Sequence, residues 1–82
     1  MENRTEILLK IQDVVRDELN DPDLVIDERT RASDVSGWDS LTHVQIIVGV
    51  EKKFGFRLKA SEVAQLEDVG SLVNHVVARG AR

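Results

Sequence analysis

The sequence contains no cysteine, so neither disulfide bonds nor thiolate metal sites can support the fold, and the chain has no thiol of its own for covalent chemistry. This absence is compatible with any redox compartment. With 82 residues, the chain lies near the lower end of what folds without a metal or a disulfide. We therefore expect one domain, spanning residues 1–82.

Basic residues are in the minority. Lys and Arg together number 11, against 15 for Asp and Glu, and the net charge is −4. A nucleic-acid partner would require a basic footprint, so this composition argues against nucleic acid as a partner. An acidic domain instead suits protein partners that present lysines and arginines.

Long apolar runs are also missing. The start of the chain, Met1 to Glu6, is charged, and no apolar run follows it, so no secretory signal peptide is expected. The longest apolar stretch, Val44–Val50, is interrupted by Gln45 and Gly49 and is far shorter than the roughly 20 residues that span a bilayer. We expect a soluble, cytoplasmic monomer without a membrane partner.

Apolar residues recur at helical spacing near the start of the chain, which predicts a helix over Thr5–Leu19. Pro22 forbids its continuation. The next segment, Asn20–Asp39, contains isolated apolar residues without a sustained period and is predicted to be a long loop. A loop of this length in so small a domain is either functional or tied down by its apolar residues, and Trp38 is a candidate for such a plug.

Three aspartates in this loop invite comparison with a calcium-binding loop. Such a loop needs glycine at its sixth position and glutamate at its twelfth. Counted from the first of these aspartates, Ile26 and Ala32 occupy the two positions, so the calcium interpretation fails. The aspartates concerned are Asp21, Asp23 and Asp27.

Two further helices are predicted in the second half of the chain. One runs from Ser40 to Phe54 and stops at Gly55, a favourable left-handed terminator. The other begins at Asp68, a favourable N-cap, and continues to about Arg79, where Gly80 follows. A short helical turn is expected at Ser61–Leu66. The predicted fold is all-α: three main helices plus a short fourth helix, packed as a bundle.

The second predicted helix has two apolar rows. On a helical wheel, one row carries His43 among its apolar members and is expected to face the core; its apolar members are Ile46, Ile47, Val50 and Phe54. We expect Ile46, Val50 and Phe54 to pack against Ile11, Val15 and Leu72. The other row is either a second wall of the core or an exposed patch for partners; it consists of Leu41, Val44 and Val48.

Ser40 lies beside the boundary of these rows, within the motif Gly37-Trp38-Asp39-Ser40-Leu41. Asp39 or Ser40 can serve simply as the N-cap of the helix. A hydrolase is not supported, because only His43 is close in sequence and there is no acidic orienter or nucleophile-elbow motif. His43 fits the description of a packed or surface histidine.

The sequence resembles the acyl carrier protein family over nearly its whole length. After the first helix and the long loop, the motif Gly37-Trp38-Asp39-Ser40-Leu41 opens the second helix, which closes with Val50-Glu51-Lys52-Lys53-Phe54-Gly55. Phe56-Arg57-Leu58 follows, and Asp68-Val69-Gly70-Ser71-Leu72 opens the last helix. The joint agreement of order and spacing is much more specific than any single piece.

This resemblance implies a carrier that is not an enzyme. The serine of the motif, here Ser40, would bear 4′-phosphopantetheine donated by coenzyme A, and acyl intermediates would be held on that arm as thioesters. A phosphopantetheinyl transferase would attach the arm with magnesium, and Asp39 matches the aspartate that helps to hold the metal during loading. The other implied partners are acyl-loading and acyl-transfer enzymes, with Leu41, Val44 and Val48 as the candidate partner-binding residues.

The second helix departs from the pattern of many fatty-acid carriers, which display carboxylates there for basic partner enzymes. After Asp39, Glu51 is the only carboxylate of this helix, and Lys52-Lys53 follow it. Together with Trp38 before the motif and Thr42-His43 after it, this favours a discrete carrier of a specialised pathway: polyketide, nonribosomal-peptide or cell-envelope biosynthesis. Two alternatives stay open: an aminoacyl or peptidyl carrier, and a helical interaction domain without a prosthetic group.

Overall fold

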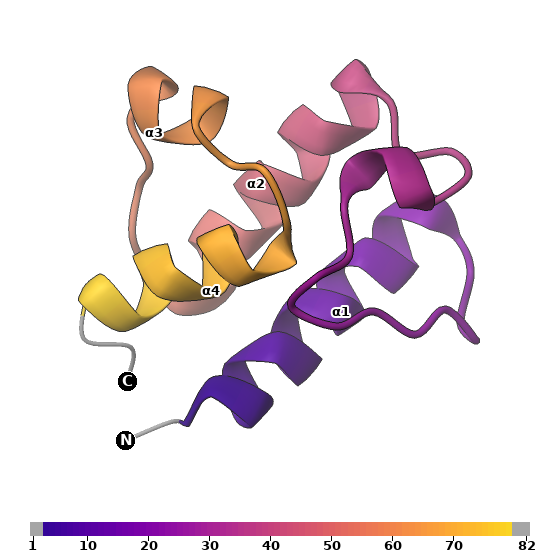
Figure 1. The fold of residues 1–82 in the computed structure, drawn as a ribbon, viewed down its shortest axis with the longest axis horizontal. Coiled ribbons are helices and arrows are strands. Elements are labelled where there is room, and N and C mark those ends of the chain that lie inside the picture. Colours follow the sequence, from indigo (N-terminus) through magenta and orange to yellow (C-terminus); the bar gives the residue numbers. More distant parts are fainter. Residues whose placement is uncertain (1–2, 80–82) are drawn as a thin grey trace.

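The computed structural model describes residues 3–79, which form a helical bundle without strands (Figure 1). Its elements are α1 (Arg4–Leu19), a 3-10 turn η1 (Ala32–Asp34), α2 (Ser40–Phe54), α3 (Ala60–Ala64) and α4 (Val69–Ala78). The predicted architecture of three main helices and a short fourth is confirmed. Among the described residues, no helix combines the length and the apolarity that crossing a membrane requires.

Local side-chain chemistry sets the helix boundaries. The side chains of Asn3, Asp39 and Asp68 accept hydrogen bonds from backbone N–H groups in the first turns of α1, α2 and α4. The Asn3 cap explains why α1 begins slightly earlier than predicted. At the other end of α2, Gly55 has φ +76°, a left-handed conformation that glycine adopts without strain.

Two further elements, α3 and η1, differ from the sequence prediction. Helix α3 begins and ends earlier than the predicted Ser61–Leu66, although Leu66 N–H still bonds the Val63 carbonyl at 3.2 Å in the following turn. The turn η1 was not predicted at all. The proposed stop at Gly80 and the chain start at Met1 lie outside the described residues.

The core is built almost wholly from aliphatic side chains where α1 packs against α2 and α4. Ile46 and Val50 of α2 are fully buried, as predicted, and Ile47 is nearly so. Ile11, Val15 and Leu72 are also buried, as expected. The core comprises Ile7, Ile11, Val14, Val15, Ile26, Ile46, Ile47, Val50, Val69, Leu72, Val73 and Val76.

Phe54 corrects the predicted core row. It packs against the core but is only half-buried, because it lies at the end of α2 where the bundle is open to solvent. Its ring lies 6.4 Å from that of Phe56, and the Lys10 ammonium is 6.0 Å from its centroid. His43, the polar member of the same row, is also half-buried and lies at the edge of the core.

Helices α1 and α2 approach each other closely at Gly49. A Cβ atom at this position would lie 2.7 Å from Cγ1 of Val14, closer than carbon atoms can pack. The absence of a side chain therefore sets the separation of the two helices at this point.

The long loop is fixed to the bundle by hydrogen bonds at several points. Ile26 is buried, and its backbone N–H donates to Oε1 of the buried Gln12 side chain at 2.9 Å. Farther along, the carbonyl groups of Glu28 and Thr30 accept from the N–H groups of Gly70 and Val69 at 2.8 and 2.9 Å. These are first-turn amides of α4, which lack partners within their own helix. The loop thus satisfies polar groups of both α1 and α4.

Gly70 is required for this contact. A Cβ atom at Gly70 would lie 2.9 Å from the Glu28 carbonyl oxygen, so a side chain would push the loop away from α4.

Two of the three aspartates considered for calcium binding, Asp21 and Asp27, form local turns in the loop. Their carboxylates accept hydrogen bonds from backbone N–H groups two residues farther along the chain.

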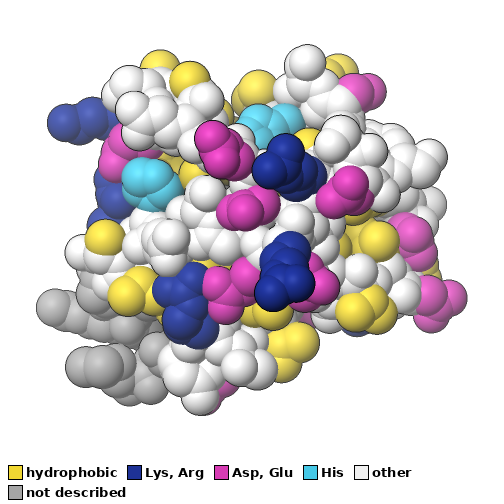
Figure 2. Space-filling model, viewed as in Figure 1, with side chains coloured by type: hydrophobic (Ala, Val, Ile, Leu, Met, Phe, Trp, Pro, Cys, Tyr) yellow, Lys and Arg dark blue, Asp and Glu magenta, His cyan; other side chains and the backbone are white. Residues whose placement is uncertain are grey.

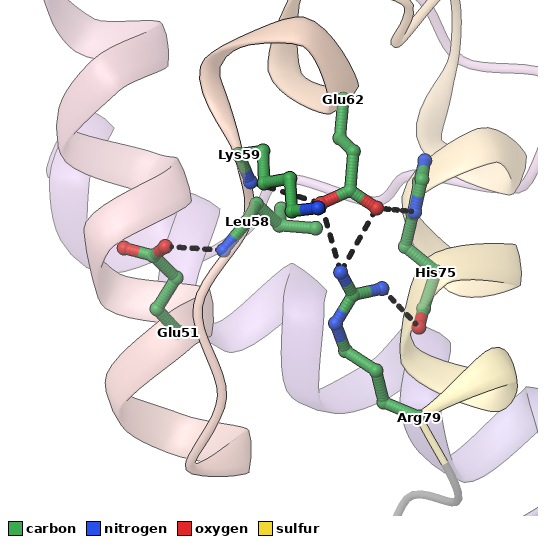
Figure 3. A network of polar contacts seen from close by, with 6 residues as sticks. All are labelled: Glu51, Leu58, Lys59, Glu62, His75 and Arg79. Atoms are coloured by element: carbon green, nitrogen blue, oxygen red, sulfur yellow. Dashed lines mark hydrogen bonds and ion pairs between the residues drawn. The ribbon is translucent and has the colours of Figure 1, made fainter.

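A network of polar contacts around Glu62 holds helix α3 in place (Figure 3). The Glu62 carboxylate accepts from Lys59 N–H at 2.9 Å and from the Arg79 guanidinium at 2.8 and 2.9 Å, while His75 Nδ1 lies 3.4 Å away. The Lys59 and Arg79 hydrogen bonds hold the pKa of Glu62 below its usual value. The network joins α3 to the end of α4.

The far end of the loop is closed by Trp38, which packs against the core. Its indole Nε1–H donates to Nδ1 of His43 at 3.1 Å, and the two ring centroids lie 6.1 Å apart. The bond requires an unprotonated Nδ1 on His43. Burial lowers the pKa of His43, which favours the same neutral form.

The surface in Figure 2 shows acidic and basic side chains interspersed, with apolar groups scattered between them. A mixed surface of this kind is typical of a folded domain, and this face has no large apolar patch.

The burial pattern of α2 predicts that Ile46→Ala lowers the free energy of unfolding by about 2–5 kcal/mol, because it opens a cavity in the core. Val48→Ala is the control on the same helix. Val48 is 41% exposed, so its truncation should change stability by less than about 0.5 kcal/mol. Urea denaturation followed by circular dichroism measures both. Equal losses for the two variants would contradict the assigned orientation of α2.

The Trp38–His43 bond predicts a loss of stability as the pH falls through the range where histidine titrates. The pKa of His43 is lower in the folded chain than its unfolded value of about 6.5. The unfolded state therefore binds the proton first, and stability declines below about pH 6.5. Tryptophan fluorescence in urea at about pH 7.5 and about pH 5.5 measures this, since Trp38 is the only tryptophan.

The control for this prediction is His43→Asn, whose amide oxygen accepts from Trp38 but does not titrate. The window lies above the range of the carboxylates, so their protonation contributes little to it. If the wild type and His43→Asn lose the same stability between the two pH values, His43 is not the titrating group.

Candidate functional site at the start of α2

Ser40 is the first residue of α2, and its side chain is exposed. The preceding residue, Asp39, is the N-cap: its Oδ1 accepts from Thr42 N–H at 2.9 Å, and its carbonyl accepts from His43 N–H at 2.8 Å. The hydrogen bonds from Thr42 hold the pKa of Asp39 below its usual value. An ionised carboxylate therefore stands next to the serine at neutral pH.

The Ser40 hydroxyl is not activated by a neighbouring base. Within residues 3–79, its side chain has no hydrogen-bond partner. Nδ1 of His43 is bonded to Trp38. A serine nucleophile requires a base within hydrogen-bond reach, so this geometry lacks the arrangement of a hydrolase. Ser40 is instead placed where another protein can reach its hydroxyl.

The surroundings of Ser40 come from three parts of the fold. A shallow depression beside it is formed by η1, by the start of α2 and by the turn after α3. Its lining residues are Ala32, Ser33, Trp38, Asp39, Ser40, His43 and Leu66. The sequence indicated Asp39 and Ser40 together, but it gave no sign that Leu66 would join them.

A more enclosed pocket lies next to this depression, between Trp38, His43, Leu66 and Leu72. Its volume is about 30 Å³, comparable with the space of a single water molecule.

The second apolar row of α2 is exposed. Leu41, Val44 and Val48 have exposed fractions of 69%, 56% and 41%. This decides between the two interpretations that the periodicity left open, because these side chains do not form a wall of the core. The row begins next to Ser40 and continues along the solvent side of the helix.

Comparison with known proteins matches most of the chain to one family. The family described as "Phosphopantetheine attachment site" matches residues 9–76. The acyl carrier protein of Thermosynechococcus vestitus is 36% identical over 80 residues, which cover 93% of this chain and 98% of that protein. The acyl carrier protein of Renibacterium salmoninarum is 30% identical over 82 residues, covering 99% of this chain and all (100%) of that protein.

A solved structure agrees with these relatives. The solution NMR structure of holo acyl carrier protein from Geobacter metallireducens superposes with a TM-score of 0.78 at 30% sequence identity, covering 90% of this chain and 88% of that one. The family match includes α2, most of α1 and most of α4. The chain therefore belongs to the acyl carrier protein family, whose members are carriers rather than catalysts and hold a covalently attached 4′-phosphopantetheine.

Proposed function

We propose that Ser40 bears the 4′-phosphopantetheine arm and that the chain, as a single carrier domain of residues 1–82, presents acyl intermediates to the enzymes of a specialised biosynthetic pathway. The observation that carries this proposal is the position of Ser40. It is exposed, it is the first residue of α2, and no described residue forms a hydrogen bond with its hydroxyl. We expect the protein to act as a cytoplasmic monomer.

The residues at the start of α2 fit a phosphodiester. The backbone N–H groups of Ser40 and Leu41 precede the first hydrogen bond within the helix, so they lack carbonyl partners in it. The helix dipole adds partial positive charge at the same end. When attached, the group supplies the thiol that a sequence without cysteine lacks. The nearby Asp39 carboxylate is suited to hold magnesium during loading.

The exposed row of α2 supports partner recognition beside the arm. Leu41 and Val44 offer apolar contact within the first turns of the helix, where a phosphopantetheinyl transferase or an acyl-loading enzyme must approach Ser40. Aliphatic side chains at the centre of an interface contribute through desolvation. We therefore assign Leu41, Val44 and Val48 to the binding of partner enzymes.

The pathway is proposed from the charges of α2. Glu51 is its only carboxylate, and Oε2 of Glu51 accepts the Leu58 N–H at 2.7 Å. The acidic surface that many fatty-acid carriers present on this helix is therefore missing here. This favours a polyketide, nonribosomal-peptide or cell-envelope pathway. The cargo, acyl or aminoacyl, would be determined by the enzyme that loads the arm.

Loading of Ser40 is the first test. A broad-specificity phosphopantetheinyl transferase with coenzyme A and magnesium should convert the wild-type chain to one heavier species by intact mass spectrometry. Ser40→Ala should gain no mass and should keep its stability within about 0.5 kcal/mol, because Asp39 rather than Ser40 caps the helix. Ser33→Ala, an exposed serine in the same depression, should load like the wild type. A mass gain on Ser40→Ala, or none on the wild type, would refute the assignment.

Partner recognition is tested by truncating the exposed row. Leu41→Ala and Val44→Ala should leave the melting temperature nearly unchanged and lower kcat/KM for loading by about tenfold, because each variant loses methyl groups that the partner would bury. Leu9→Ala and Val77→Ala are matched controls, since these residues are 52% and 45% exposed on α1 and α4. If the α2 variants unfold at lower temperature and load normally once folded, the row serves packing alone.

A further inference from the structure

The exposed row of α2 continues into a groove at the end of the helix distant from Ser40. Lys52 follows Val48 by one helical turn, as Val48 follows Val44, so these side chains share a face. The groove has a volume of about 380 Å³. It is lined by Val48, Glu51, Lys52, Gly55, Phe56 and Arg57.

The rim of this groove is positively charged, although the chain as a whole has a net charge of −4. Lys52 and Arg57 are exposed, and within the described residues neither forms an ion pair. The one carboxylate of the groove belongs to Glu51, which already accepts the Leu58 N–H (Figure 3). An incoming ligand therefore meets two unpaired cations and one acidic group with an existing partner.

The floor of the groove is apolar. Val48 belongs to the exposed row, and Phe56 is half-buried, with the Arg79 guanidinium 5.2 Å from its ring centroid. A complementary ligand needs aliphatic groups for this floor and carboxylates for Lys52 and Arg57. Arginine pairs with carboxylates through two parallel hydrogen bonds, which favours a carboxylate at the Arg57 side.

We propose that this groove binds an acidic, amphipathic segment of a partner protein, with its carboxylates on Lys52 and Arg57 and its aliphatic side chains on Val48 and Phe56. The proposal rests on the proposed function, because it extends the partner-binding row of α2 from Ser40 to the other end of the helix. The net charge of the chain suits partners rich in lysine and arginine, whereas this groove suits a partner segment of the opposite, negative charge. The partner enzyme would be acidic where it contacts this groove.

Charge complementarity favours a protein over other anionic partners. A nucleic acid or an anionic membrane would encounter the excess of acidic residues on the rest of the chain, whereas a short acidic segment needs only this groove. Exposed ion pairs are weakened by salt, so the contribution of Lys52 and Arg57 should decline as the salt concentration rises, while that of the apolar floor should not.

The test is an NMR titration of the isotope-labelled full chain with a synthetic helical peptide that carries leucine and glutamate on one face. Amide shifts should appear at Val48, Phe56 and Arg57. The variant Lys52→Glu/Arg57→Glu should weaken binding by about tenfold, since two attractive pairs become repulsive. The variant Arg29→Glu/Arg31→Glu imposes the same charge change on exposed residues of the long loop and should bind like the wild type.

A peptide with lysine in place of glutamate, a thymidine oligonucleotide and phosphatidylglycerol vesicles are the comparison ligands. The proposal is overturned if the acidic peptide shifts no groove amide, if both double variants bind alike, or if any comparison ligand shifts these amides more strongly. The titration does not require a loaded Ser40. Failure to gain mass with the transferase would therefore refute the proposed function, while failure at the groove would refute this inference alone.

Discussion

The packing of α1 against α2 and α4 is the contact on which the rest of the structure depends. The chain has no disulfide, and the core contains aliphatic side chains almost exclusively, so stability comes from close contact between these three helices. Gly49 allows α1 and α2 to meet at Val14 with no side chain between them. A domain of this size has little stability to spare, and each buried isoleucine or valine accounts for a substantial part of it.

The long loop depends on this core and in turn shapes the site. Ile26 enters the core, and the Glu28 and Thr30 carbonyls bind the first amides of α4. With the loop fixed at these points, Trp38 reaches His43 and closes the bundle immediately before Ser40. The backbone around the serine is therefore ordered although the serine itself is exposed. An exposed hydroxyl on an ordered helix start suits modification by another enzyme better than catalysis by its own neighbours.

The helices could be predicted from the sequence because their information is local. Apolar periodicity placed α1, α2 and α4, and the caps Asp68 and Gly55 fixed two of their ends. The motif around Ser40 is equally local, and the family match covers it. These features depend on residues within one or two helical turns of each other, which the order of the sequence displays directly.

The features that the sequence did not reveal depend on contacts between distant residues. Gln12 lies on the buried side of α1, yet nothing in the sequence connects it with Ile26 in the loop. Glu62 and Arg79, which join α3 to α4, are likewise far apart in the chain. The wheel of α2 separated two apolar rows, but it could not show which of them another element covers. That outcome is decided by the position of α1, which packs against α2 so that Ile46 is buried and Leu41 stays exposed.

Helix α2 thus has two separate surfaces, one that packs in the core and one that is exposed to solvent. The row of Ile46 and Val50 can tolerate little change, because its neighbours fill the space around it. The other row, Leu41, Val44 and Val48, is exposed to solvent, so its side chains can vary in charge and size without loss of the fold. In this chain that row is aliphatic beside Ser40, and the groove at its far end is lined by Lys52 and Arg57, so the two ends of the helix differ in surface chemistry.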